Sequence, residues 1–101
     1  MELAALHPGR ILREEFLAPV RLSPEELALR LGVPNENIAG LVNETSALTA
    51  AIALRLARFF GTSSDFWMEL QARYELAEVR AEIGEAIAVI QPFSAAGSQS
   101  T

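Results

Sequence analysis

The sequence contains no cysteine, so neither a disulfide framework nor a cysteine-ligated metal site is possible. It has a single histidine, His7, with no second metal-ligand or base candidate near it in the chain. We therefore expect His7 to cap a first helix. A glycine-rich phosphate loop and a paired metal-ligand motif are also missing. These absences predict a protein that is not an enzyme and needs no cofactor.

Long apolar runs are missing as well. Residues 1–7 lack the basic start and apolar run of a signal peptide, and no stretch approaches the roughly 20 apolar residues that cross a bilayer. We therefore expect a soluble, cytoplasmic protein with no membrane partner. Lysine is absent, and 13 acidic residues outnumber the 8 arginines, for a net charge of −5. This balance does not favour nucleic-acid binding, although a local basic patch would be enough for it.

Half of the residues are apolar, which is enough for the core of one helical domain. Glycine, proline and capping residues divide the chain into helices. Ser23 is a good N-cap, and Glu26 three positions later completes a capping box. Ala18-Pro19 should end the first helix, and Asn43 should end the third in a left-handed conformation. The predicted helices span residues 8–18, 23–31, 34–43 and 49–60, and a fifth begins at residue 63.

The apolar positions of the last helices predict a core and an interface. Phe59 and Phe66 lie on inner stripes, and we expect Trp67 beside them in the core. From residue 77 the pattern continues as an amphipathic helix with glutamates between its apolar residues. Its stripe consists of Val79, Ile83, Ile87 and Ile90. It fits a dimer seam, a partner-binding helix or ordinary core, and we favour the dimer seam because so small a chain gains from burying it.

The central signal is a pair of short helices, 23–31 and 34–43, joined by a tight turn that contains Gly32. A helix-turn-helix needs a short first helix, a sharp turn, and a second helix that can enter the major groove of DNA. Ile38 and Leu41 supply the apolar anchor of the second helix. The arrangement predicts a helix-turn-helix scaffold.

Residues around this scaffold carry a resemblance to a known family. The matching residues are His7-Pro8-Gly9, Ile11 to Leu17, Leu22-Ser23, Glu26 to Ala28, Leu31 to Val33, Ala53 to Ser63, Phe66-Trp67 and Leu70-Gln71. The sequence is similar to the HigA-type antitoxins, also called virulence-associated protein I, in the Xre group of helix-turn-helix proteins. The resemblance implies an all-α, five-helix, lambda-repressor-like domain with a C-terminal helical extension. It also implies a homodimer that neutralises a RelE-like (HigB-like) ribonuclease toxin and represses its own operon.

The chain departs from this family on the surface that would read DNA. The resemblance places the DNA-binding residues at Ser23, Asn35, Glu36, Asn37, Gly40, Asn43, Thr45 and Ser46. Family members are rich in arginine and lysine there, whereas residues 31–54 of this chain contain no basic side chain. The usual glycine after Asn43 is replaced by Glu44. Because phosphate neutralisation by lysine and arginine supplies most non-specific DNA affinity, we expect weak binding to operator DNA.

Two hypotheses about function remain open. The chain is an antitoxin that binds both a toxin and operator DNA, or it is an interaction module of the same family that has lost most DNA binding. The predicted organisation is a helix-turn-helix domain at residues 1–76 and a C-terminal helix at 77–92 for dimerisation or partner binding. A disordered tail is expected at 93–101.

Overall fold

The computed structural model describes residues 6–94, and every regular element in that range is helical. The elements are α1 (Pro8–Ile11), η2 (Leu12–Leu17), α2 (Ala18–Val20), α3 (Pro24–Leu31), α4 (Asn35–Val42), α5 (Ala50–Phe60) and α6 (Ser64–Ala88). The first three are consecutive parts of one helix, so the described residues form five helices, and the predicted all-α class is confirmed. None of these helices is long and apolar enough to cross a membrane.

The first helix does not end at Ala18-Pro19, as the sequence predicted. It continues to Val20 and ends at Arg21, whose φ is 57°. The physical reason lies in η2, a π-helical segment in which the Ala18 N–H donates to the carbonyl of Arg13, five residues back. This wider turn makes room for the ring of Pro19 in the last turn of the helix.

Three further helices, α3, α5 and α6, start at residues whose side chains cap them. Oγ of Ser23 accepts the Glu26 N–H at 3.0 Å, Thr49 does the same for Ile52 at 3.3 Å, and Ser63 for Phe66 at 3.0 Å. These bonds satisfy backbone donors that have no partner inside the helix. The Glu26 carboxylate pairs with Arg30 at 3.0 Å.

His7 caps α1, as expected, because its Nδ1 accepts the Gly9 N–H at 2.9 Å. The ring is 5% exposed and packs edge-on against Tyr74 of α6. The one histidine therefore has a structural role where the first helix meets the last.

The end of α4 differs from the prediction at one residue. Asn43 has φ −86° and ψ 0°, and the left-handed residue is Glu44, with φ 62°. Left-handed backbone disfavours a side chain with a Cβ, and this is the position at which the resembling family carries glycine. Glu44 therefore adopts a conformation that glycine would hold without this steric cost.

The core lies where the four N-terminal helices and the start of α6 meet. Its largest fully buried side chain is Trp67, whose indole Nε1 donates to Thr62 Oγ1 at 2.7 Å. The ring contacts Phe16 and Phe66, with centroids 4.8 Å and 5.1 Å away. Trp67 is thus a core residue, as predicted. Phe59 and Phe66 were expected in the core but are only half-buried against it. The inner face of α5 consists of Ile52, Ala53 and Leu56, and that of α6 consists of Trp67, Leu70 and Gln71.

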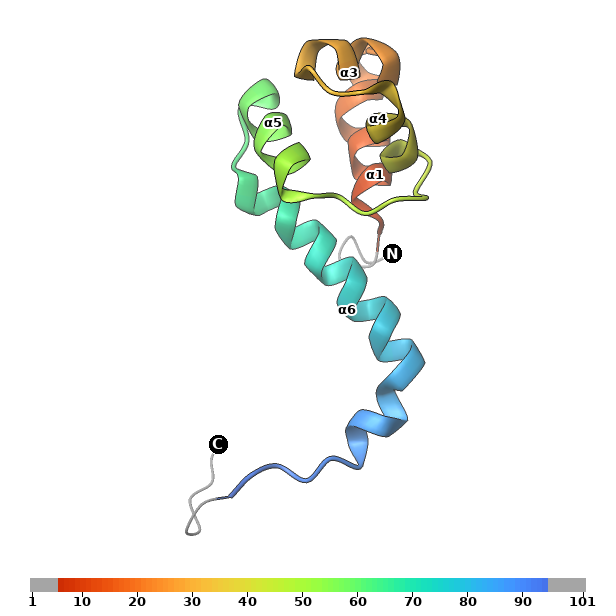
Figure 1. The fold of residues 1–101 in the computed structure, drawn as a ribbon, viewed down its shortest axis with the longest axis vertical. Coiled ribbons are helices and arrows are strands. Elements are labelled where there is room, and N and C mark those ends of the chain that lie inside the picture. Colours follow the sequence, from red (N-terminus) through yellow and green to blue (C-terminus); the bar gives the residue numbers. More distant parts are fainter. Residues whose placement is uncertain (1–5, 95–101) are drawn as a thin grey trace.

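The C-terminal half of α6 projects from the helical head, so the molecule measures 57 × 25 × 24 Å (Figure 1). The expected C-terminal helix is therefore the continuation of α6, which has non-helical φ and ψ at Ile83. The helix ends at Ala88, so Ile90 lies beyond it, contrary to the predicted range of 77–92. Of the expected tail at 93–101, residues 95–101 lie outside the described residues, and Phe93 and Ser94 are exposed.

Candidate nucleic-acid interface

The two helices of the helix-turn-helix, α3 and α4, are joined by a turn that is fixed at the end of α3. Gly32 adopts φ 73°, and the Val33 N–H donates to the Ala28 carbonyl at 3.1 Å. From α5, Arg55 donates to the Leu31 carbonyl at 2.6 Å, which satisfies one of the open carbonyls at the end of α3. The orientation of α4 relative to α3 is therefore held by backbone contacts and by a side chain from a third helix.

The first helix supports α4 from behind through Gly9. A Cβ at this position would overlap the carbonyl oxygen of Leu41, so only glycine allows the two backbones to come this close. Arg13 of the same helix donates to the Val42 carbonyl and pairs with the Glu44 carboxylate at 3.1 Å. The C-terminal end of α4 is thus fixed from one helix by a close approach and an arginine cap.

The first turn of α4 is exposed on its outer side. Asn35, Glu36 and Asn37 are all exposed in its first turn, while Ile38 and Leu41 are buried beneath them. Asparagine can read adenine edges in the major groove through its amide. The predicted residues of α4 therefore stand together on the surface that a recognition helix would present.

The turn after α4 brings three more of the predicted residues together. The Gly40 carbonyl accepts the N–H groups of Thr45 and Ser46, at 2.9 Å and 3.2 Å, and the Thr45 hydroxyl at 3.1 Å. A Cβ on Gly40 would lie 2.7 Å from Ser46 Oγ. Gly40, Thr45 and Ser46 thus shape the turn, and Asn43 lies exposed within it.

Two further polar side chains bond the backbone at segments beside this surface. Ser23 begins α3, and its hydroxyl can still donate a proton while it accepts the capping bond. Gln71 of α6 is 5% exposed and accepts the Leu48 N–H at 2.9 Å, which holds the segment that leads from the turn to α5.

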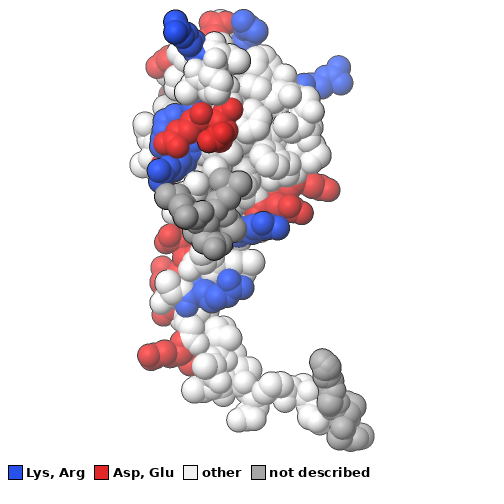
Figure 2. All heavy atoms as spheres, turned by 180° about the vertical axis from the view of Figure 1, so that it is seen from behind, with Lys and Arg blue, Asp and Glu red and all other residues white. Residues whose placement is uncertain are grey.

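The charges around this surface are largely compensated. The arginines of the first helix and of α3 are paired: Arg10 with Glu14 at 3.4 Å, Arg13 with Glu44, and Arg30 with Glu26. Figure 2, a view from behind Figure 1, shows acidic and basic side chains mixed over the head, and both kinds also occur along the projecting part of α6. The surface therefore offers hydrogen-bonding groups with little net positive charge.

The predicted dimer residues stay on the surface of the described chain. Val79, Ile83, Ile87 and Ile90 are 45%, 41%, 51% and 64% exposed. The capping roles of Arg13 and Arg55 were not predicted from the sequence. No local pattern could have revealed them, because their carbonyl partners lie 29 and 24 positions away.

Comparisons with known proteins agree with this geometry. The helix-turn-helix family model HTH_3 matches residues 12–67. Virulence-associated protein I of Dichelobacter nodosus is 41% identical over 93 residues, 92% of this chain and 85% of that protein. Antitoxin HigA-1 of Vibrio cholerae serotype O1 is 30% identical over 92 residues, 91% of this chain and 87% of that protein.

A solved structure of a similar protein has a similar fold. The Pseudomonas aeruginosa antitoxin HigA with the higBA promoter aligns with a TM-score of 0.85 at 42% identity, over 88% of this chain and 98% of that one. Fold, helix-turn-helix geometry and sequence therefore lead to one assignment. The chain belongs to the HigA/VapI-type antitoxins of the Xre helix-turn-helix family.

Proposed function

We propose that this chain is the antitoxin of a type II toxin–antitoxin system. In this role it neutralises a RelE-like ribonuclease toxin and represses its own operon by binding operator DNA as a homodimer. The observation that carries the DNA half is the exposed polar surface of α4 and its following turn, held on a rigid helix-turn-helix frame. The similar Pseudomonas HigA structure contains promoter DNA, which supports this role.

In the complex, α4 lies in the major groove, where Asn35 and Asn37 meet base edges. Ser23 and Ser46 then lie at the rims of the helix-turn-helix surface, where their hydroxyl groups donate to phosphates. Thr45 lies beside them and shapes the turn through its bonds to the Gly40 carbonyl. Glu36 and Glu44 oppose the phosphates, so binding depends more on hydrogen bonds than on charge.

The toxin half of the proposal rests on the family and on charge. A ribonuclease that binds an RNA backbone is expected to present a cationic surface. The net charge of −5 on this chain favours association with such a surface.

Dimerisation gives the protein two recognition helices for two half-sites. We assign it to the projecting part of α6 with the exposed side chains Val79, Ile83 and Ile87. Burial of this stripe removes apolar surface from water, at about 25 cal/mol for each Å².

The absence of basic side chains from residues 31–54 favours a second candidate, an interaction module that binds the toxin without DNA. Fluorescence anisotropy with DNA from the upstream region separates the two. Antitoxin-repressor function requires a higher affinity for that DNA than for a scrambled duplex of equal length. In this role the chain should also co-purify with the toxin encoded beside it, and its co-expression should relieve the growth arrest that the toxin causes. Toxin binding with equal affinity for both duplexes would support the interaction module.

A further inference from the structure

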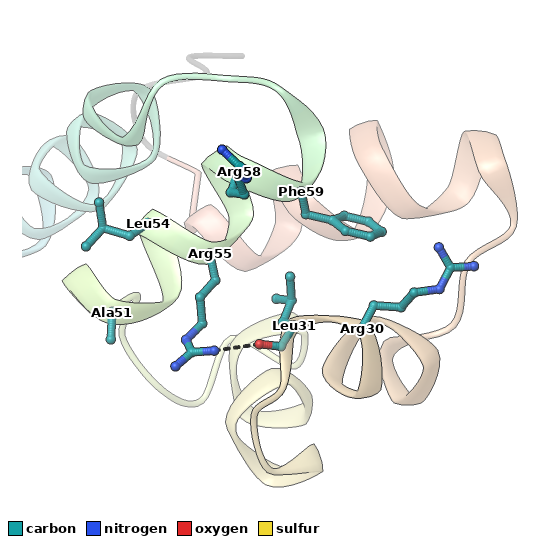
Figure 3. A pocket seen from close by; sticks show the side chains of 7 residues that line it. All are labelled: Arg30, Leu31, Ala51, Leu54, Arg55, Arg58 and Phe59. Carbon is teal, nitrogen blue, oxygen red and sulfur yellow. Dashed lines mark hydrogen bonds between the residues drawn. The ribbon is translucent and has the colours of Figure 1, made fainter.

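A groove of about 550 Å³ lies between the end of α3 and the outer side of α5 (Figure 3). Its lining residues are Arg30, Leu31, Ala51, Leu54, Arg55, Arg58 and Phe59. Leu54 is 61% exposed and contributes apolar surface to this groove. The groove therefore combines exposed apolar surface with three arginines and lies outside the DNA-reading surface described above.

The three arginines differ in the bonding partners that their side chains already have. Arg55 bonds the Leu31 carbonyl (Figure 3), and Arg30 pairs with Glu26 while its guanidinium lies 5.9 Å from the Phe59 ring centre. Arg58 is exposed, and no carboxylate of the described residues lies within 4.0 Å of it. The groove thus has a free positive charge beside an apolar floor.

The projecting part of α6 has the opposite character. Its apolar side chains Val79, Ile83 and Ile87 are exposed, and Glu75, Glu78, Glu82 and Glu85 occur among them with one arginine, Arg80. Glu82 precedes Ile83, and Glu75 lies seven residues, two helical turns, before Glu82 on the same side of the helix. One edge of the apolar stripe is therefore acidic.

We propose that the α3–α5 groove of each chain receives the projecting α6 segment of a second copy. An acidic, apolar helix matches an apolar groove lined with arginine both in hydrophobic surface and in charge sign. An isologous dimer repeats the contact by symmetry, so the pair buries two grooves and two stripes. This inference rests on the homodimer of the proposed function and specifies what the stripe packs against.

Cysteine crosslinking tests the contact directly, because the natural chain has no cysteine. Ala51→Cys places a thiol in the groove, and Val79→Cys or Ile83→Cys places one on the stripe. A short bis-maleimide added to a mixture of groove and stripe variants, with subunits tagged to differ in mass, should give a mixed covalent dimer. A stripe variant alone should stay uncrosslinked. Efficient crosslinking of the stripe variants alone, without the mixed product, would overturn the proposal and indicate a seam between the two α6 helices.

Charge reversal gives an independent measurement on the same dimer. Arg58→Glu and Glu82→Arg should each raise the dimer dissociation constant about tenfold, and the double variant should recover most of the loss. Arg73→Glu is the matched control, since Arg73 is an exposed arginine of α6 outside the groove and has no carboxylate of the described residues within 4.0 Å. Circular dichroism confirms that each variant is folded.

The outcomes separate this inference from the dimer itself. If Arg58→Glu leaves the dissociation constant unchanged while Ile83→Asp produces monomers, the dimer stands and the groove is not its site. If the unmodified chain is monomeric at all concentrations tested, both the dimer and the groove contact fail.

Discussion

Gly9 allows a close contact between the first helix and the recognition helix. It lies where the backbone of α1 approaches the carbonyl of Leu41 in α4, and a Cβ would occupy the space of that oxygen. The contact involves backbone on both sides, so neither partner can move away by rotating a side chain. Gly9 thus sets the distance between the first helix and the recognition helix.

Gly9→Ala should therefore lower the free energy of unfolding by about 3 kcal/mol, the upper range for overpacking a close contact. Chemical denaturation followed by the fluorescence of Trp67 measures the change. Gly84→Ala is the matched control, because a Cβ there meets nothing within 4 Å and alanine favours a helix by up to about 1 kcal/mol. Equal stabilities of the two variants would contradict the role given to Gly9.

At the scale of elements, α6 has two different halves. Its first half packs on the core through Trp67, Leu70 and Gln71, whereas its second half leaves the head with its apolar residues exposed. Helix α6, which is kinked at Ile83, thus connects a buried anchor to an exposed surface. Substitutions in the two halves should therefore have different consequences.

In the first half, Trp67→Ala should cost about 4 kcal/mol, because the side chain is fully buried and its indole N–H is bonded. Phe59→Ala should cost about half as much, since Phe59 is only half-buried. Urea denaturation followed by far-ultraviolet circular dichroism compares the two variants. A larger loss for Phe59 would show that the core is centred elsewhere.

In the second half, Ile83→Asp with Ile87→Asp should leave stability nearly unchanged and convert dimers to monomers. Both side chains are about half exposed in the single chain, so charge there does not disturb the core but opposes burial in an interface. Analytical ultracentrifugation at micromolar concentration measures the oligomeric state. A double variant that remains dimeric would place the seam away from α6.

At the scale of the whole molecule, charge governs the proposed DNA binding. The net charge is −5, and the arginines of the first helix and α3 already face glutamates. Each phosphate contact contributes about 0.9 to the slope of log affinity against log salt concentration. We therefore expect weak operator binding at physiological salt and a shallow slope.

The triple variant Glu36→Arg, Glu44→Gly and Thr45→Lys should bind operator DNA more tightly and with a steeper slope. It removes two negative charges from the DNA-reading surface and adds two positive ones, and glycine also suits the φ of 62° at position 44. Anisotropy titrations of both proteins at several salt concentrations measure the slopes. Nanomolar, steeply salt-dependent binding by the unmodified chain would mean that arginines outside α4 contact the phosphates.

The sequence alone determined the helical class and most helix boundaries, because capping and glycine signals act within a few residues. Ser23, Thr49 and Ser63 begin their helices as predicted, and Gly32 and Gly61 end theirs with positive φ. The exposed residues of α4 also followed from the sequence, since helical periodicity separates them from the buried Ile38 and Leu41.

Only the tertiary structure decided the features that depend on residues far apart in the chain. The caps that Arg13 and Arg55 supply, the close approach at Gly9 and the arginine groove join residues more than 20 positions apart. The left-handed conformation fell on Glu44 instead of Asn43, and the bonds that fold this turn onto Gly40 accompany that shift. Local propensity sets where a helix begins and ends, but packing sets which of its side chains meet another helix.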